Sequence, residues 1–248
     1  MADLDPFAGL AAVLGTAPVQ VDPHRQSRKG VPEVVFAGAK PPRLTLQAVQ
    51  KLLEHQPFGR VLVSRADAET IDLLRAELEP SGATVLGAPS GGTVLVTRAD
   101  AAPPPVTGGV VGLLTAGASD APSADEAAWI AREMGCRVVR ADDVGVAGLH
   151  RLETPLRALR EEGVDAVIVA AGMDGALPSV VAGLIDVPVI GLPTSVGYGL
   201  GGGGVAALLS MLQTCAPGLV VVNIDNGIGA GATAALFANR VAQARKGR

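Results

Sequence analysis

The chain has 248 residues and a net charge of −4, with 48% hydrophobic and 18% charged side chains, so it is neither disordered nor suited to bind a polyanion. Aromatic side chains make up only 2% of the residues and leave little to stack on nucleic-acid bases. Two cysteines make no disulfide framework, so the sequence predicts a reduced, cytoplasmic protein. No apolar run is long enough to span a membrane, and no basic stretch followed by an apolar one marks a signal peptide. We therefore expect the protein to bind neither nucleic acid nor membrane.

The first 100 residues predict a small α/β domain with a flexible start. Short β-like runs cover residues 33–37, 61–63, 83–86 and 93–96. Apolar residues at helical spacing separate the first three runs, at Leu46, Val49 and Leu53 and again at Ile71, Leu74 and Leu78.

Residues 101–107 follow this domain. Three consecutive prolines, Pro103 to Pro105, can continue neither a helix nor a central strand, so we interpret this stretch as a linker.

Residues 108–248 predict a larger parallel α/β domain. Five continuous apolar runs, at 110–114, 137–139, 166–169, 187–192 and 219–224, indicate strands covered on both faces. They alternate with helical patterns at about 123–134, 148–161, 177–185, 204–213 and 230–245. Ser123, with Glu126 three residues later, resembles a capping box at the start of the first of these helices. The alternation predicts a doubly wound parallel sheet, whose ligands bind at the carboxyl ends of the strands.

The loops after these five strands are rich in glycine and polar residues, at 116–120, 142–151, 171–179, 193–204 and 223–227. Glycine lets the backbone approach a ligand, and N–H groups at helix starts attract phosphate. One such loop is ordinary turn chemistry, but five at one sheet edge predict a pocket for an anionic, nucleotide-like ligand. No Walker motif and no well-placed GxGxxG occurs, which argues against ordinary ATPases and dehydrogenases.

Several polar residues in these loops have two open interpretations. His150 is a candidate for proton transfer and Arg151 for pairing with phosphate or carboxylate, but a surface histidine and a solvated arginine fit the sequence equally well. Asp174, between two glycines, is a candidate base or magnesium ligand. For Asp120 and Asp225 a capping or turn role is favoured over a chemical one.

The two cysteines differ in their surroundings. Cys136 stands at the start of a predicted strand, where a buried and inert thiol is favoured. Cys215 follows an apolar helix, in a loop before the last predicted strand. A thiol in a loop can act as a nucleophile when its thiolate is stabilised, so Cys215, expected close to the strand-end loops, is a candidate nucleophile, although an ordinary loop thiol fits the sequence as well.

Part of the sequence resembles the aminoimidazole ribonucleotide (AIR) carboxylase family. The resemblance rests on Ser119-Asp120, His150-Arg151 with Thr154-Pro155, and residues 171–179 followed by 187–191. It implies a three-layer, flavodoxin-like fold for the C-terminal domain and chemistry that moves carbon dioxide on a nucleotide. The family's second histidine is missing, because Ala176 precedes Leu177-Pro178 here, and this departure puts ordinary purine synthesis in doubt.

A longer resemblance, over most of the chain, is to the LarB family. It includes Arg25, Arg28, Gly30, residues 32–35 and Lys40, and then the strings at 143–148, 175–183, 193–199, 215–216 and 222–227. LarB proteins make pyridinium-3,5-biscarboxylic acid mononucleotide for the nickel-pincer cofactor of lactate racemase. Two departures stand out: Asp174 replaces an expected glutamate, which shortens the reach of the side chain, and Ile228 replaces an expected aromatic residue.

The LarB resemblance implies carboxylation of the pyridinium ring of nicotinic acid adenine dinucleotide at carbon 5, with release of AMP. Cys215 would be the nucleophile and Asp174 or His150 the base; CO2 or bicarbonate would be the co-substrate, Mg2+ the cofactor, and a homo-octamer the assembly. The chain would bind its substrate through side chains and backbone of Ser119, Asp120, Arg151, Gly172, Met173, Gly175, Ser195, Gly197, Gly199 and Gly201, with Lys40 and Arg65 contributed by the N-terminal domain. The apolar character of the last two helices also favours burial against partner subunits.

Two other functions remain open on the sequence. An AIR carboxylase or mutase would need His150 but not Cys215. A non-catalytic nucleotide-binding subunit would keep its ligand after the loss of Cys215.

Overall fold

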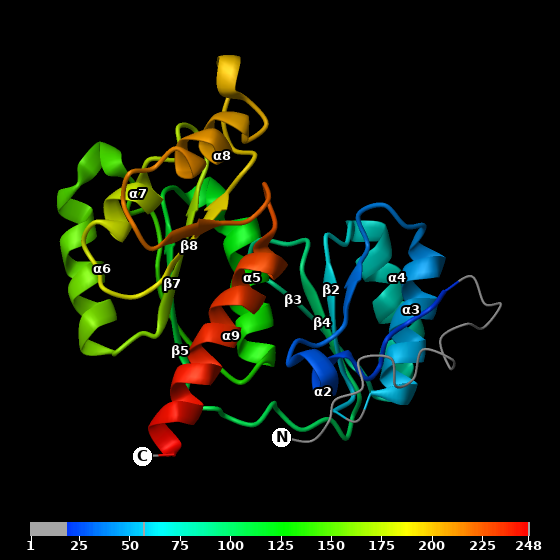
Figure 1. Cartoon of the computed structure of the whole chain (residues 1–248). Helices are drawn as coiled ribbons and strands as arrows, with labels where there is room; N and C mark the ends of the chain where they lie inside the picture. Colours follow the sequence, from blue (N-terminus) through cyan, green and yellow to red (C-terminus); the bar gives the residue numbers. More distant parts are fainter. Residues whose placement is uncertain (1–18, 57, 248) are drawn as a thin grey trace. The chain divides into compact units, whose positions relative to one another are not determined.

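The computed structural model describes residues 19–56 and 58–247, and the predicted flexible start lies outside these residues. The chain divides into two compact units, Met1–Pro103 and Pro104–Arg248. The boundary therefore falls between two prolines of the 101–107 stretch. Figure 1 shows the smaller unit in blue to cyan and the larger one in green to red.

The smaller unit is a four-stranded mixed sheet with two long helices. Its strands β1 (Val34–Phe36), β2 (Arg60–Ser64), β3 (Thr84–Gly87) and β4 (Val94–Thr97) lie in the order β1-β2-β4-β3. β1 and β2 are parallel, and the other pairs are antiparallel. The helices are α2 (Arg25–Lys29), α3 (Pro42–His55), α4 (Ala68–Leu78) and the short η1 (Glu79–Ser81). The predicted apolar positions Val49 and Leu74 are fully buried in the core of this unit, as helical spacing requires.

The larger unit is the predicted doubly wound domain. Its strands β5 (Val110–Thr115), β6 (Arg137–Ala141), β7 (Ala166–Ala171), β8 (Val189–Pro193) and β9 (Leu219–Val221) lie in the order β6-β5-β7-β8-β9. All four pairings are parallel. This order is that of a flavodoxin-like sheet, in which the chain reverses direction across the sheet at the first and third strands. The predicted fold class is confirmed.

Helices cover both faces of this sheet and make three layers (Figure 1). On one face α5 (Ala121–Glu133) and α9 (Gly227–Lys246) pack together and against β5 and β7. On the other face the buried residues of α6 (His150–Glu161), α7 (Leu177–Ala182) and α8 (Val205–Leu212) join those of the strands in one core. Small residues let α5 and α9 approach closely: a Cβ on Gly231 would lie 2.3 Å from the Ala127 carbonyl oxygen. One face of the alanine-rich α9 is thus buried within its own chain, whereas Phe237 and Val241 of the same helix are exposed, and α8 keeps an exposed apolar stripe.

The structure corrects several local predictions. Helix α5 begins at Ala121 with Pro122 in its first turn, so Ser123 is not its cap, and Ser123 instead donates a hydrogen bond to Asp225. The edge strands β6 and β9 are half-exposed, because each has a neighbouring strand on one side only. Strand β9 ends at Val221, three residues before the apolar run ends. None of the helices in the described residues is long and apolar enough to cross a membrane.

Candidate active site at the carboxyl ends of the parallel strands

Three central strands end side by side and send their loops to the same edge of the sheet. The register pairs Thr115 of β5 with Ala170 of β7, and Ala171 of β7 with Pro193 of β8. Since all the strands are parallel, the loop after β6 and the segment after β9 leave from this edge too. We call these five segments (residues 116–120, 142–149, 172–176, 194–204 and 222–226) the strand-end loops.

A buried carboxylate ties three of the strand-end loops together. Asp120, at the end of η2 (Ala118–Asp120), accepts a hydrogen bond from Thr194 Oγ1 at 2.6 Å and from the Gly117 N–H at 2.8 Å. Burial raises the pKa of Asp120, and the hydrogen bonds from Thr194, Gly117 and Gly172 offset part of that rise. The bond from the Gly117 N–H is the capping role that the sequence favoured for Asp120, and the bond from Thr194 adds a tie to a second loop. A substrate contact through Asp120 stays a prediction.

A second carboxylate, Asp225, ties the segment after β9 to the same edge. It accepts hydrogen bonds from Ser123 Oγ at 3.2 Å and from the Ser195 N–H at 2.9 Å, while its own N–H bonds to the Pro193 carbonyl at 2.8 Å. Its charge adds to the rise of the Asp120 pKa. The backbone N–H of Ser195, a predicted substrate contact, is thus engaged within the chain.

Strained backbone is concentrated in the strand-end loops. Asp143, Met173 and Asp225 have φ between 52° and 57°, and among the described residues of the larger unit they are all the non-glycine residues with positive φ. L-residues pay roughly 1–3 kcal/mol for this conformation and hold it only where the surroundings enforce it, most often at functional sites. The backbone thus points to this edge independently of any motif.

The loop after β6 is clamped by Arg140. This side chain donates from Nε to both oxygens of Asp142 at 2.9 Å and forms an ion pair with the buried Asp125 of α5. Thr115 Oγ1 donates to Asp142 at 3.1 Å and accepts the Asp143 N–H at 3.1 Å. The loop that leads to His150 is therefore fixed to the end of β5.

Arg151 holds the other end of this loop. It donates to the Asp143 carbonyl at 2.8 Å and to the Gly145 carbonyl at 3.4 Å, and pairs with the Asp143 carboxylate at 3.0 Å. Because a guanidinium has five N–H groups, some remain for a ligand anion. His150, the first residue of α6, is exposed at the same edge after η3 (Val146–Gly148).

The loop after β7 approaches the loop after β8 through a position that only glycine can occupy. A Cβ on Gly172 would lie 2.2 Å from the Val196 carbonyl oxygen, and the next residue donates its N–H to that same oxygen at 2.7 Å. Gly175, at φ 62°, would bring a Cβ within 2.7 Å of the Ala207 backbone. These glycines position Met173 and Asp174, both exposed, at the surface of this edge.

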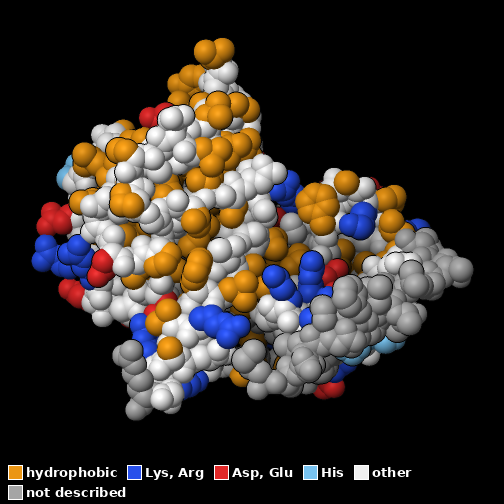
Figure 2. Space-filling view, viewed as in Figure 1, with side chains coloured by type: hydrophobic (Ala, Val, Ile, Leu, Met, Phe, Trp, Pro, Cys, Tyr) orange, Lys and Arg blue, Asp and Glu red, His pale blue; other side chains and the backbone are white. Residues whose placement is uncertain are grey.

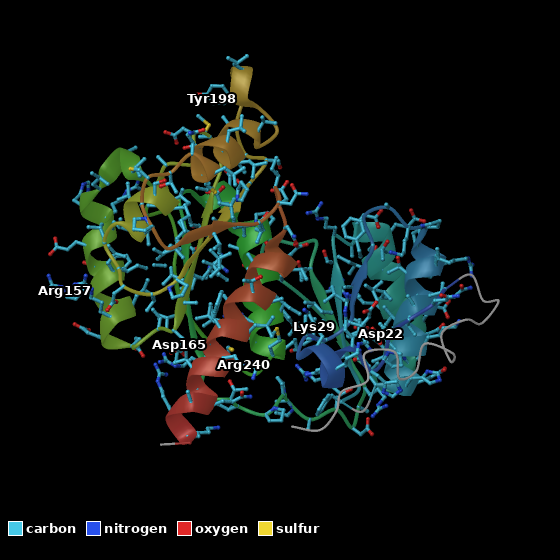
Figure 3. The ribbon with its side chains drawn as sticks, viewed as in Figure 1. Asp22, Lys29, Arg157, Asp165, Tyr198 and Arg240 are labelled. Atoms are coloured by element: carbon cyan, nitrogen blue, oxygen red, sulfur yellow. The ribbon has the colours of Figure 1, made fainter. Side chains whose placement is uncertain are left out.

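Several predicted site residues lie exposed at the outer surface of this edge. Ser119, Ser195, Gly197 and Gly199 are exposed, and Gly199 and Gly201 bound the short helix η4 (Gly199–Gly201). In Figure 3, Tyr198 stands out at this end of the unit, whereas Asp165, which precedes β7, lies toward the other end. The predicted site residues Ser119, His150, Arg151, Asp174 and Ser195 thus share one edge.

Cys215 lies at the opposite edge of the same sheet. It is exposed, in the loop 213–218 between α8 and β9. The Gly218 carbonyl at the end of this loop accepts the N–H of Val189, the first residue of β8. From there β8 runs about 13 Å to Pro193, at about 3.3 Å per residue, before the strand-end loops begin. Within one chain, Cys215 is therefore not close to the strand-end loops, contrary to the sequence-based expectation.

Cys136 is the buried, inert thiol that the sequence predicts. Its Sγ donates to Asn239 Oδ1 at 3.2 Å, and burial raises its pKa to about 11. At neutral pH this thiol stays protonated, and the thiolate is the nucleophilic form.

In the smaller unit, Lys40 and Arg65 meet around one aromatic ring. The Lys40 Nζ lies 5.7 Å and the Arg65 Cζ 5.4 Å from the centre of the half-exposed Phe36 ring. Lys40 also donates to the Phe36 carbonyl at 2.6 Å, and Arg65 has φ 56°. The parallel register pairs Phe36 with Ser64, so the segments carrying both cations leave from one edge of this sheet. Sequence reasoning named both cations but missed Phe36, a lone aromatic residue without a motif.

The described residues contain no group of three or more His, Cys, Asp or Glu side chains that could hold a metal ion. A hollow of about 830 Å³ between α6 and α7 is lined by Leu152, Leu156 and Val180 among others, and it reaches the strand-end loops at Leu149.

The fold and this edge define a flavodoxin-like domain of the AIR carboxylase type. The family model for AIR carboxylase matches residues 110–247, and that for the LarB/PurE-like N-terminal domain matches residues 14–85. A protein of Methanocaldococcus jannaschii, described only as uncharacterized, is 41% identical over 223 residues, which cover 89% of this chain and 84% of that protein. The chain belongs to the LarB family, and its domains are those of a carboxylase-type enzyme.

Proposed function

We propose that this enzyme carboxylates carbon 5 of the pyridinium ring of nicotinic acid adenine dinucleotide and hydrolyses the phosphoanhydride, giving pyridinium-3,5-biscarboxylic acid mononucleotide and AMP for nickel-pincer cofactor synthesis. The observation that carries the proposal is Cys215, an exposed free thiol in a LarB-family chain. The other cysteine is buried, with its pKa raised to about 11, and cannot serve.

The electronic demand of the ring explains why a thiolate is needed. A pyridinium ring is electron-poor and does not attack carbon dioxide. When the Cys215 thiolate bonds to carbon 4, the electron pair moves to the ring nitrogen and the ring becomes a neutral dihydropyridine. Carbon 5, now the carbon of an enamine, bonds to carbon dioxide. A base removes the proton from carbon 5, the C–S bond breaks, and the pyridinium is restored with the thiolate.

The strand-end loops offer the remaining groups. Asp174 is the proposed base at carbon 5, with His150 as the alternative on the same edge. Free N–H groups of Arg151 and glycine backbone at positions such as Gly197 and Gly201 are suited to anionic parts of the substrate. The diphosphate needs positive charge when water attacks phosphorus and AMP leaves, and Lys40 and Arg65 are proposed for that part.

The test is to incubate the enzyme with nicotinic acid adenine dinucleotide, ¹³C-bicarbonate and Mg2+, with and without a chelator. Mass spectrometry should find a ¹³C-labelled, doubly carboxylated mononucleotide together with AMP. Cys215→Ala should form neither the carboxylated product nor an adduct on the intact protein, whereas Cys136→Ala, the matched control, should form both. Absence of product from the wild type would reject the proposed function.

The alternative with a specific observation behind it is an AIR carboxylase-like purine enzyme, because the AIR carboxylase model covers residues 110–247. Ala176 stands where that family has a histidine, which disfavours it. Turnover of aminoimidazole ribonucleotide that depends on His150 and survives Cys215→Ala would favour this alternative. Binding of a nucleotide without any turnover would favour a non-catalytic subunit.

A further inference from the structure

Tyr198 is the only aromatic residue in the strand-end loops and the only tyrosine of the chain. It is 82% exposed, and Figure 3 shows it projecting at the end of the larger unit. Figure 2 shows hydrophobic side chains at the same end. A buried aromatic side chain removes roughly 150–250 Å² from water, so the fold gains little from this ring where it stands. The face of the Tyr198 ring is therefore available to a ligand.

The loop after β8 places Tyr198 close to Asp174, the proposed base. The Met173 N–H donates to the Val196 carbonyl at 2.7 Å, and a Cβ on Gly197 would lie 3.5 Å from the Met173 nitrogen. Tyr198 and Asp174 are thus each one residue beyond this contact. Since consecutive Cα atoms are about 3.8 Å apart, the Cα atoms of these two residues are at most about 13 Å apart. A ring that lies over Met173 is within reach of both side chains.

Glycines on both sides of Tyr198 allow its ring to turn toward such a ligand. Gly197 has φ 151° and Gly199 has φ 71°, which other residues rarely adopt. A Cβ on Gly199 would meet no atom within 4 Å, so this part of the loop is open. Leu200, two residues after Tyr198, is fully exposed as well. The backbone around Tyr198 is therefore not locked by packing.

The face of an aromatic ring attracts cations. Its quadrupole places negative charge on the face, and a cation within about 6 Å of the ring centre is held there. The proposed substrate carries its positive charge in a flat pyridinium ring, which can stack on the phenol ring of Tyr198. The exposed carboxylate of Asp174 adds negative charge to the same place. Together, the two side chains suit a flat, cationic ring.

We propose that Tyr198 binds the pyridinium ring of the substrate by stacking on it, and that it distinguishes the cationic ring from a neutral dihydropyridine. The inference rests on the proposed function for the identity of the ring. That ring is cationic in the substrate and in the product, but neutral while the thiolate is bonded to carbon 4. The contact therefore stabilises bound substrate more than the adduct, and its loss should raise KM without lowering kcat.

The single tyrosine makes this contact visible without turnover. The full chain is labelled with ring-¹³C tyrosine and carries Cys215→Ala, so that no adduct forms. Nicotinic acid adenine dinucleotide should shift the tyrosine ring signals in NMR spectra. The 1,4-dihydro form of the dinucleotide, whose ring is neutral, should bind roughly three- to tenfold more weakly and shift these signals less. Adding Tyr198→Leu should make the two affinities equal.

Steady-state kinetics test the role of the ring in the active enzyme. Tyr198→Leu removes the aromatic face and should raise KM for the dinucleotide roughly three- to tenfold, with kcat unchanged or higher. Tyr198→Phe keeps the face and should leave KM within about twofold of the wild type. Leu200→Ala is the matched control in the same loop and should change neither constant. Because Tyr198 and Leu200 are exposed, these variants are expected to fold.

The outcomes separate the role of Tyr198 from the proposed function. A signal shift that requires the cationic ring, without any product from the wild type, would reject the proposed function and support the ring contact. Product from the wild type, with unmoved tyrosine signals and an unchanged KM in Tyr198→Leu, would overturn the ring contact and leave the function standing. Equal loss of affinity for both forms of the dinucleotide in Tyr198→Leu would overturn the recognition of ring charge.

Discussion

Asp120 shows how a single carboxylate holds the geometry of the strand-end loops. It accepts hydrogen bonds from residues that follow β5 and β8, and its burial raises its pKa above the ordinary value of 3.8. A raised pKa means that the folded protein holds this proton more tightly than the unfolded chain. The contribution of Asp120 to stability is therefore fully present below the unfolded pKa and is lost as pH rises through the folded pKa.

We expect this pH dependence of stability to appear when the wild type is compared with Asp120→Asn, whose side-chain amide does not titrate. The free energy of unfolding of the wild type, relative to that of the variant, should fall as pH rises from about 4, by about 1.4 kcal/mol for each unit by which the folded pKa is raised. Urea unfolding at a series of pH values measures the difference. Parallel pH profiles for the two proteins would contradict the expectation.

At the residue scale, Lys40 and Arg65 are expected to serve the diphosphate of the substrate. Charge-assisted hydrogen bonds contribute about 1.5–3 kcal/mol, so Lys40→Ala or Arg65→Gln should raise KM for the dinucleotide by roughly tenfold or more. Arg75→Gln is the control, because Arg75 lies on α4 and pairs only loosely with Asp72 at 4.0 Å. Steady-state kinetics measure KM, and an unchanged KM in both variants would reject the proposed role of Lys40 and Arg65.

At the element scale, the loop after β6 depends on Arg140. Removing this side chain breaks the ion pair with Asp125, whose side chain is only 3% exposed. Because breaking a buried ion pair costs about 3–5 kcal/mol, and Arg140 itself is partly exposed, we expect Arg140→Gln to lose up to about 3 kcal/mol. Chemical denaturation measures this loss in the free energy of unfolding. Arg157→Gln removes an exposed pair with Glu153 and should cost less than about 1 kcal/mol.

The start of helix α5 shows where local sequence signals were insufficient. Ser123 and Glu126 fit a capping box, yet the helix begins two residues earlier at Ala121. Proline is favoured in the first helical turn, and Pro122 supplied that signal. The hydroxyl of Ser123 was then free to bond Asp225, which is 102 residues away in the chain. No local pattern could indicate this partner.

At the scale of the whole molecule, assembly is predicted by the exposed stripe of α8, formed by Val205, Leu209 and Leu212, and the family resemblance leads us to expect an octamer. Leu209→Lys should shift the protein to smaller species, because it places a charge in the centre of an apolar contact. Light scattering coupled to size-exclusion chromatography measures the mass. Leu86→Lys, at a similarly exposed position of β3 (54% against 58%), is the control and should leave the mass unchanged. If Leu209→Lys leaves the mass of the assembly unchanged, the contact between subunits does not involve the α8 stripe.

The sequence by itself determined the fold class of the larger unit and the edge that carries the site. Continuous apolar runs predict strands covered on both faces, and the parallel alternation places all the loops after them at one edge. Ser119, His150, Asp174 and Ser195 therefore belong together, as expected. Their common position follows from local periodicity and chain direction, which are properties of the sequence.

Only the tertiary structure decided which side chains serve the loops and which edge holds the thiol. Asp120 and Thr194 are both buried and hydrogen-bond to each other, and Arg140 pairs with the buried Asp125; each pair joins segments that lie far apart in the sequence. Cys215 was expected close to the strand-end loops, but the connection through α8 returns the chain to the amino end of β9. Proximity in three dimensions depends on strand direction and order, so the thiol and the base are separated by a strand that hydrogen bonds keep extended.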